Sequence, residues 1–425
     1  MNPKLRAPLT TDTKIARWKE EAEQKIAPYL KRADQTALAN QAKVLAAFRE
    51  NRVSDHHMNP STGYGYDDEG RDVLERVYAS AFGAEAALVR NQIISGTHAI
   101  SIALFGILRP GDELLYITGE PYDTLASIVS GPEGKDTGSL RDFGITYRHI
   151  DLKEDGTVDF AAVREAVSDR TKMIAIQRSK GYSLRPSFTV AQIGEMVGEI
   201  RSIKPDAVIF TDNCYGEFVE EAEPTEAGVD LMAGSLIKNP GGGLAKTGGY
   251  LAGRADLIEK CAYRMTSPGI GGEAGASLGT LPDMYQGFFL APHVTAQAVK
   301  GAIFTSAMLE AAGMETAPHY SADRTDLIQS VSFGNAEQMI RFCGEIQANS
   351  PVNAHFAPVP SYMPGYEDDV IMAAGTFVQG SSIELTADGP IRPPYTAYIQ
   401  GGLTFEHVQI AIMNALGSLL EDRLL

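Results

Sequence analysis

Three segments of the sequence carry residue types that could do chemistry together. Ser95-Gly96-Thr97-His98 opens an apolar stretch, Asp212 directly follows the apolar run 208–211, and Lys238 ends a run that begins at residue 231. In open α/β proteins, ligands bind beyond the carboxyl ends of the strands. We therefore expect these three segments to meet at one edge of a sheet and to bind different parts of one ligand.

The first segment is suited to a phosphate group. The N–H groups at the start of a helix have no partner inside the helix and lie at the positive end of its dipole. The small residues Gly96 and Thr97 would let a ligand approach the backbone closely. The simpler interpretation of Ser95 is that it only caps the helix.

The second and third segments place an acid and an amine in half-buried surroundings. A carboxylate after a buried strand is costly unless it meets a cation, such as a protonated ring nitrogen or Mg²⁺; otherwise Asp212 only caps a loop. Burial lowers the pKa of a lysine and frees its amine to form a Schiff base, which makes Lys238 the predicted nucleophile. Lys246, inside a glycine-rich loop, and Lys180, which follows Arg178, rank lower.

Residues 241–247 (GGGLAKT) offer a different interpretation, because they resemble the phosphate-binding loop of NTPases. That motif requires two glycines at fixed distances before its lysine. Anchored on Lys246, those positions fall on Pro240 and Ala245. The sequence therefore disfavours an NTPase.

The three segments together match the needs of pyridoxal phosphate. Its phosphate suits a helix N-terminus, its pyridinium nitrogen suits a carboxylate, and its aldehyde requires an amine. Tyr122 follows the predicted strand 113–117 and could lie on the face of the cofactor ring. As an ordinary aromatic residue it would simply pack in the core or on the surface.

The elements that must position these residues alternate between strand and helix. Apolar runs predict strands at 87–89, 113–117, 145–150, 172–176, 207–211 and 231–236, and helices at 96–108, 122–130, 160–167, 190–200 and 257–264. This alternation favours a largely parallel sheet covered by helices on both faces. Residues 248–253 follow the preceding strand closely and are predicted to be an antiparallel partner.

The two ends of the chain depart from this pattern. Apolar spacing predicts two helices in the first fifty residues, packed on this chain or on a neighbouring subunit, and then a glycine-rich loop at 54–70. A helix from 294 to about 312 leads to predicted strands near 328–332, 370–374, 382–385 and 395–399 and helices at 336–348 and 406–421. The predicted domains are a helical arm (1–60), a large α/β domain (61–300) and a small α+β domain (301–425).

Composition limits the classes of partner. The 425 residues include 37 Lys+Arg and 54 Asp+Glu, a formal charge of −17, which disfavours binding to nucleic acids and anionic membranes. No run reaches the roughly 18 apolar residues of a membrane span, and the first twenty residues lack the apolar core of a secretory signal. The three cysteines are far apart and form neither a disulfide framework nor a zinc motif. We expect a cytoplasmic protein.

Asp55-His56-His57 is a further candidate, for a metal site. Adjacent histidines point in different directions in most backbones, so they seldom bind one ion together. We expect this segment to have a structural role and predict no metal. His98 is expected to be a helix-start residue near the cofactor.

Several longer motifs, in this order, resemble one known family. The sequence is similar to the fold-type-I pyridoxal-phosphate enzymes and, within them, to the methionine gamma-lyase family of carbon–sulfur lyases, some of which are called aluminium resistance proteins. The resemblance runs from about Gly63 to the last helix. Its most specific stretches are residues 64–71 (YGYDDEGR), 95–100 (SGTHAI), 211–217 (TDNCYGE) and 235–243 (SLIKNPGGG). It implies a mostly parallel seven-stranded sheet in the large domain, followed by the smaller α+β domain.

The resemblance also implies roles for single residues. Lys238 would hold pyridoxal phosphate as a Schiff base, Asp212 would pair with the pyridine nitrogen, and Tyr122 would stack on the ring. The phosphate would be bound by Gly96, Thr97 and Ser235.

In related lyases, a loop near the N-terminus reaches the phosphate of the adjacent subunit. Tyr64 and Tyr66 are the matching candidates, and they imply a homo-oligomer, a tetramer built from dimers that share active sites. An arginine of the small domain binds the substrate carboxylate in these enzymes. Arg392 is the predicted residue, with Arg185 and Arg178 as alternatives.

The implied reaction is β- or γ-elimination from a sulfur amino acid such as methionine, cystathionine or cysteine. Lys238 would remove the Cα proton and Tyr122 would protonate the departing sulfur, giving a thiol, a 2-oxo acid and ammonia. Ile237 and Asn239 stand where studied lyases carry Thr and Tyr, so the substrate stays open. The alternatives are an aminotransferase, an aldolase, or a cofactor-binding stress protein with little turnover.

Overall fold

The computed structural model describes residues 12–132, 134–363 and 366–425. Its larger sheet has seven strands in the order β1-β7-β6-β5-β4-β2-β3. They are β1 (Ala86–Arg90), β2 (Glu113–Tyr116), β3 (Thr146–His149), β4 (Thr171–Gln177), β5 (Val208–Asp212), β6 (Leu231–Ser235) and β7 (Gly249–Gly253). β7 runs antiparallel to both of its neighbours, β1 and β6, and the other pairings of this sheet are parallel. The predicted mostly parallel seven-stranded sheet and its antiparallel strand are confirmed.

Helices cover both faces of this sheet, because successive side chains of its central strands point in opposite directions. In β4, Met173 and Ala175 face the cluster that includes α3, whereas Ile174 and Ile176 face the cluster that includes α6. The helices are α2 (Glu69–Ala81), α3 (Gly96–Ile107), α4 (Asp123–Val129), α5 (Phe160–Ala166), α6 (Val190–Ile203) and α7 (Ala255–Met265). α2 was not among the predicted helices.

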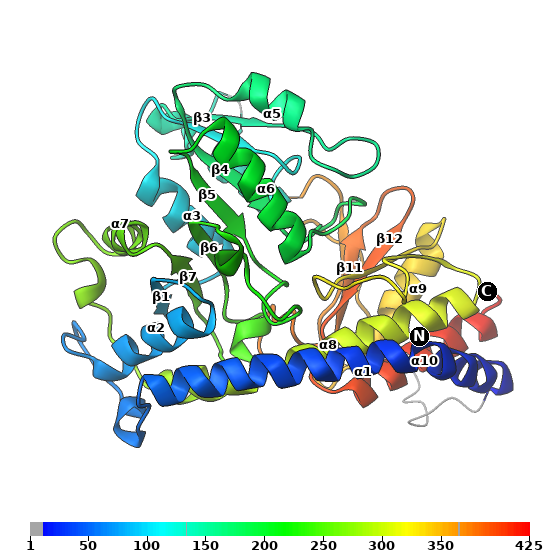
Figure 1. Cartoon of the computed structure of the whole chain (residues 1–425). Helices are drawn as coiled ribbons and strands as arrows, with labels where there is room; N and C mark the ends of the chain where they lie inside the picture. Colours follow the sequence, from blue (N-terminus) through cyan, green and yellow to red (C-terminus); the bar gives the residue numbers. More distant parts are fainter. Residues whose placement is uncertain (1–11, 133, 364–365) are drawn as a thin grey trace.

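The N-terminal segment is one helix, α1 (Thr13–Glu50), and not the two that we predicted. α1 lies along α8 (Leu281–Ala311), below both sheets in the view of Figure 1. Its first half buries Ile15, Trp18 and Ile26 in the cluster that includes α8, and its second half buries Val44 in the cluster that includes α2. Continuous packing of this apolar stripe explains why the helix continues through Pro28.

The smaller sheet is antiparallel, with strand order β10-β11-β12-β9-β8. Its strands are β8 (Glu315–Ala317), β9 (Gln329–Ser332), β10 (Val370–Ala373), β11 (Thr386–Pro390) and β12 (Thr396–Gln400), and it is accompanied by α9 (Ala336–Ala348) and α10 (Phe405–Glu421). The predicted strand at 382–385 is wrong. Its apolar residues Ile383 and Leu385 are buried in the core, but sheet pairing begins only at Thr386.

α8 runs without interruption through position 300, where the boundary between the large and the small domain is predicted. The division into residues 1–60, 61–300 and 301–425 stays a prediction. Within the described part of the chain, no helix combines the length and the apolar character that crossing a membrane requires.

Candidate active site

A cavity of about 230 Å³, which we call the lysine cavity, opens at the carboxyl edge of the larger sheet. β5 ends at Asp212, β6 ends at Ser235, and α3 begins at Gly96, so three parts of the fold converge there. The predicted residues that line this cavity are Gly96, Thr97, Tyr122, Asp212, Ser235 and Lys238. The structure therefore brings together the segments that contain Gly96, Asp212 and Lys238, as the sequence predicts.

Lys238 lies three residues beyond β6, in the turn before a short 3-10 helix. Its Nζ sits over the ring of Tyr215, 3.8 Å from the ring centre. Burial alone would lower the pKa of Lys238, but the nearby Cys214, Tyr215 and Asp212 raise it above the ordinary value. The predicted lowering of this pKa is thus wrong, because the acidic neighbours outweigh burial.

Asp212 is the last residue of β5 and is 7% exposed. Its Oδ1 accepts a hydrogen bond of 3.1 Å from the backbone N–H of Cys214. Burial raises the pKa of Asp212, and Lys238 opposes this rise only in part. A protonated ring nitrogen placed against this carboxylate would therefore stabilise its charged form.

The backbone around Tyr215 is strained. Tyr215 has a φ of +72°, in the left-handed region that side chains with a Cβ seldom adopt. This conformation places its ring below the amine of Lys238, and residues held in this way concentrate at functional sites. The sequence predicts no role for Tyr215, although this residue lies within the motif 211–217.

The start of α3 has the features of a phosphate site. Ser95 Oγ accepts from the N–H of His98, so Ser95 caps the helix as its simpler interpretation states. The N–H groups of Gly96 and Thr97 occupy the first turn, where a helix supplies no partner. A Cβ at Gly96 would lie only 3.2 Å from Cys214 Sγ and from Ser235 Cβ, so the wall is closely packed.

Ser235 Oγ is buried and has no hydrogen-bond partner within the described chain. Because buried hydroxyl groups are rarely left without a partner, this atom indicates a polar ligand in the lysine cavity. Gln177 Oε1, which belongs to the same cavity wall, is likewise without a partner among the described residues.

Tyr122 lies where three cavities meet. It lines the lysine cavity, an open cleft of about 440 Å³, and a smaller cavity of about 140 Å³. Its hydroxyl lies 2.6 Å from the hydroxyl of Tyr366. Burial raises the pKa of Tyr122 well above its ordinary value, so the phenol keeps its proton and is able to donate a hydrogen bond.

Of the three candidate arginines, Arg392 alone lines the open cleft. Its side chain is 49% exposed and pairs with Asp368 Oδ2 at 3.0 Å. Tyr122 and Gln177 line both this cleft and the lysine cavity, so Arg392 faces the adjoining space. Arg185 instead donates to the backbone carbonyls of Pro186, Gln177 and Ser179 and fastens its own loop.

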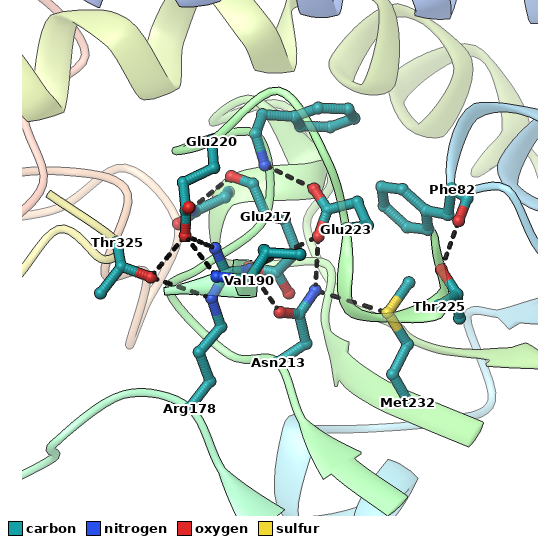
Figure 2. Close-up of polar contacts among 12 residues, drawn as sticks. Phe82, Arg178, Val190, Asn213, Glu217, Glu220, Glu223, Thr225, Met232 and Thr325 are labelled. Carbon is teal, nitrogen blue, oxygen red and sulfur yellow. Dashed lines mark hydrogen bonds and ion pairs between the residues drawn. The ribbon is translucent and has the colours of Figure 1, made fainter. Parts of the chain in front are cut away.

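Arg178 is fully buried, and its guanidinium is engaged with other side chains (Figure 2). It donates to Asn213 Oδ1 and to Glu220 Oε1, both at 2.8 Å. Asn213 in turn donates to Glu223 Oε2 at 2.9 Å. Because Asn213 directly follows Asp212, this network holds the segment that positions the acid.

The rival lysines lie outside the lysine cavity. Lys180 Nζ donates to the carbonyl of Ala317 and to Ser330 Oγ, both at 2.9 Å, and lines the open cleft. Lys246 is 76% exposed and pairs with Asp283. Among the predicted lysines, therefore, only Lys238 shares a cavity with Asp212.

Tyr64 and Tyr66 stack on each other with ring centres 5.3 Å apart, and they are 73% and 56% exposed. Neither is among the residues that line the lysine cavity of their own chain. Two other large apolar residues, Ile94 and Leu278, are also exposed. The loop that contains Tyr64 and the loop that contains Leu278 are joined by two hydrogen bonds, from Gly275 N–H to Tyr64 O and from Leu278 N–H to Ser61 O.

His56 and His57 lie close to Glu69, with the ring nitrogens 3.4 and 3.5 Å from its carboxylate oxygens. His57 Nδ1 accepts a hydrogen bond from the N–H of Ser54, so a neutral His57 carries its proton on Nε2. A metal at this position would need the lone pair of that nitrogen. The hydrogen bond thus supports the structural role that we predict for this segment.

Solved structures of low sequence identity share the fold of this chain. The pyridoxal-5'-phosphate-dependent protein YhfS of Escherichia coli is 18% identical, with a TM-score of 0.59 over 92% of this chain and 97% of that chain. This likeness confirms the predicted fold-type-I class.

Closer solved structures share the sequence as well. A Listeria innocua protein described as a candidate cystathionine beta-lyase involved in aluminum resistance is 64% identical, with a TM-score of 0.94 over 96% of this chain and all of that chain (100%). A carbon–sulfur lyase involved in aluminum resistance from Clostridium novyi is 47% identical, with a TM-score of 0.92 over 96% of each chain. The sequence profile described as methionine gamma-lyase matches residues 15–420. The chain therefore belongs to the methionine gamma-lyase family, as its motifs predicted.

Proposed function

We propose that this protein is a pyridoxal-phosphate-dependent carbon–sulfur lyase that releases a thiol from a sulfur-containing amino acid. The observation that carries the proposal is the single cavity in which Lys238, Asp212 and the first turn of α3 meet. Family membership, together with relatives described as carbon–sulfur lyases, supports the same class of reaction.

The residues present fit the cofactor. The unpartnered hydroxyl of Ser235 and the free N–H groups of Gly96 and Thr97 would bind its phosphate. Asp212 would pair with the ring nitrogen, and Lys238 would hold the aldehyde carbon. When bound, the cofactor supplies a sink for the electron pair left at Cα.

Side chains of the protein move the protons and orient the substrate. The amine of Lys238, once released by the substrate amine, accepts the Cα proton. Tyr122, whose phenol stays protonated, donates to the departing sulfur. Arg392 binds the substrate carboxylate from the cleft side, which fixes the substrate in one orientation.

The exposed pair Tyr64 and Tyr66 supports an oligomeric enzyme. Large apolar side chains gathered on adjoining loops mark surfaces that other proteins cover. We propose that a second copy covers this surface and that the two tyrosines reach the phosphate in that copy. A tetramer built from such dimers, located in the cytoplasm, completes the proposal.

The test begins with the absorbance spectrum of the protein after addition of pyridoxal phosphate. The wild type and Lys246→Ala are expected to show the visible band of a lysine Schiff base, and Lys238→Ala is expected to lack it. An equal band in Lys238→Ala would overturn the assignment of Lys238.

The reaction is tested by supplying methionine, cystathionine and cysteine and measuring thiol, ammonia and 2-oxo acid. Elimination produces the three products in equal amounts without a second substrate. A requirement for an added 2-oxo acid would instead show aminotransfer, and product formation without thiol would overturn the lyase.

A further inference from the structure

The smaller cavity of about 140 Å³ adjoins the lysine cavity and shares Tyr122, Gly181 and Tyr215 with it. Its far wall belongs to the smaller sheet and includes Thr386 and Asp388 of β11. A substrate held at Lys238 could therefore extend its far end into this space. We call it the distal pocket.

Polar atoms without partners face the distal pocket. Ser381 Oγ, Ser382 Oγ, Thr386 Oγ1 and Asp388 Oδ1 are buried and have no hydrogen-bond partner at normal distance within the described chain. The second oxygen of Asp388 accepts from Gln400 Nε2 at 3.2 Å. A buried oxygen without a partner carries a desolvation cost, and four of them around one cavity indicate a ligand with several hydrogen-bond donors.

The charge of that ligand follows from Asp388, which is only 5% exposed. No lysine, arginine or histidine of the described residues forms an ion pair with it, although buried carboxylates are normally paired. Burial raises the pKa of Asp388 to about 7, and the neighbouring Tyr182 opposes the rise only in part. A cationic group of the ligand would lower this pKa again and stabilise the charged carboxylate.

The remaining walls suit a cation as well. Tyr122, Tyr182, Tyr215 and Tyr366 all line the distal pocket. Aromatic faces attract ammonium groups through their electron-rich centres, and an ammonium group brings three hydrogen-bond donors to the unpartnered oxygens.

We propose that the distal pocket binds a second ammonium group of the substrate, so that the enzyme prefers thioether amino acids with an amine beyond the sulfur over those that end in a methyl group. This inference rests on the proposed function, because Lys238 is taken to hold the α-amino end. Arg392 in the open cleft is left for the α-carboxylate.

The test compares two substrates that differ only at the far end: S-(3-aminopropyl)-L-cysteine, and S-butyl-L-cysteine with a methyl group in place of the ammonium. The wild type is expected to favour the amine by about tenfold or more in kcat/KM, as a hydrogen-bonded charge implies. Equal kcat/KM values would overturn the proposal.

Three variants test which residues produce the preference for the substrate with the ammonium group. Asp388→Asn should reduce the ratio of the two kcat/KM values to about 1, and Thr386→Val should reduce it partially. Glu384→Gln changes another buried carboxylate of the same segment, one that accepts from the N–H groups of Phe377 and Val378, and should keep the ratio. A ratio is insensitive to partial misfolding, and an unchanged ratio in Asp388→Asn would contradict the role of Asp388.

Calorimetry separates this inference from the proposed function. The ligands are 3-(3-aminopropylthio)propionate and 3-(butylthio)propionate, which lack the α-amine and cannot react. Tighter binding of the amine by the wild type, lost in Asp388→Asn, would support the distal pocket even if no lyase activity were found. Equal binding of both ligands would overturn it.

Discussion

At the scale of single residues, the charge of Lys238 decides how the cofactor is captured. Only the neutral amine attacks an aldehyde, and the neighbours of Lys238 raise its pKa. We expect the rate at which the visible band forms to rise about tenfold for each pH unit between about 7 and 9, since the neutral fraction grows in that proportion below the pKa. Stopped-flow mixing of the cofactor-free protein with pyridoxal phosphate measures this rate. A rate that does not change over this range would mean that the pKa of Lys238 is lowered, as burial alone predicts.

Replacing Ser235 should weaken cofactor binding without changing the stability of the fold. Because its hydroxyl has no partner in the described chain, Ser235→Ala should leave the melting temperature of the cofactor-free protein unchanged. The affinity for pyridoxal phosphate should fall about tenfold or more, the effect of one lost hydrogen bond to a charged group. Equilibrium dialysis measures the affinity.

Thr295 provides the matched control, since its buried hydroxyl also lacks a partner in the described chain but lies in α8, away from the cavity. Thr295→Val should leave the cofactor affinity as it is. If both variants weakened binding equally, the hydroxyl of Ser235 would have no specific part in it.

At the scale of elements, the sequence predicted those whose residues follow one regular pattern. The strands of the larger sheet are apolar runs followed by polar residues, so their ends, and with them Asp212 and Lys238, could be located. β11 could not, because Asp388-Gly389-Pro390 has the composition of a turn although it pairs with β10 and β12. Its strand character depends on tertiary pairing, so the distal pocket had no signal in the sequence.

β11 also leads to a prediction about stability. Asp388 has a pKa of about 7 in the fold against an ordinary value of 3.8, so the folded state keeps this proton longer than the unfolded state. The stability that the protonated group contributes is complete below about pH 4 and is lost as the pH rises through about 7. The fully buried charge then costs up to about 4 kcal/mol.

Asp388→Asn removes this charge. We expect the variant, relative to the wild type, to gain stability as the pH is raised from 4 to 8, with most of the gain between pH 4 and 7. Urea unfolding of both proteins at a series of pH values measures the difference. If the difference in unfolding free energy between the two proteins did not change with pH, the pKa of Asp388 would not be raised in the folded state.

At the scale of the whole molecule, the question is whether one chain holds a complete site. Tyr64 and Tyr66 are exposed and lie outside the lysine cavity of their own chain, while the resemblance assigns them to the phosphate. Both statements hold together only if the tyrosines serve a second copy. Each active site would then combine Lys238 of one subunit with the tyrosine loop of the other.

Subunit mixing tests this arrangement directly. Lys238→Ala lacks the amine, and the double variant Tyr64→Ala, Tyr66→Ala lacks the loop, so each alone should be inactive. Random reassociation of equal amounts makes half of the dimers mixed, and each mixed dimer has one site with an intact lysine and intact tyrosines. About a quarter of the wild-type activity should return. If the tyrosines served their own subunit, every site in the mixture would lack one part, and no activity would return.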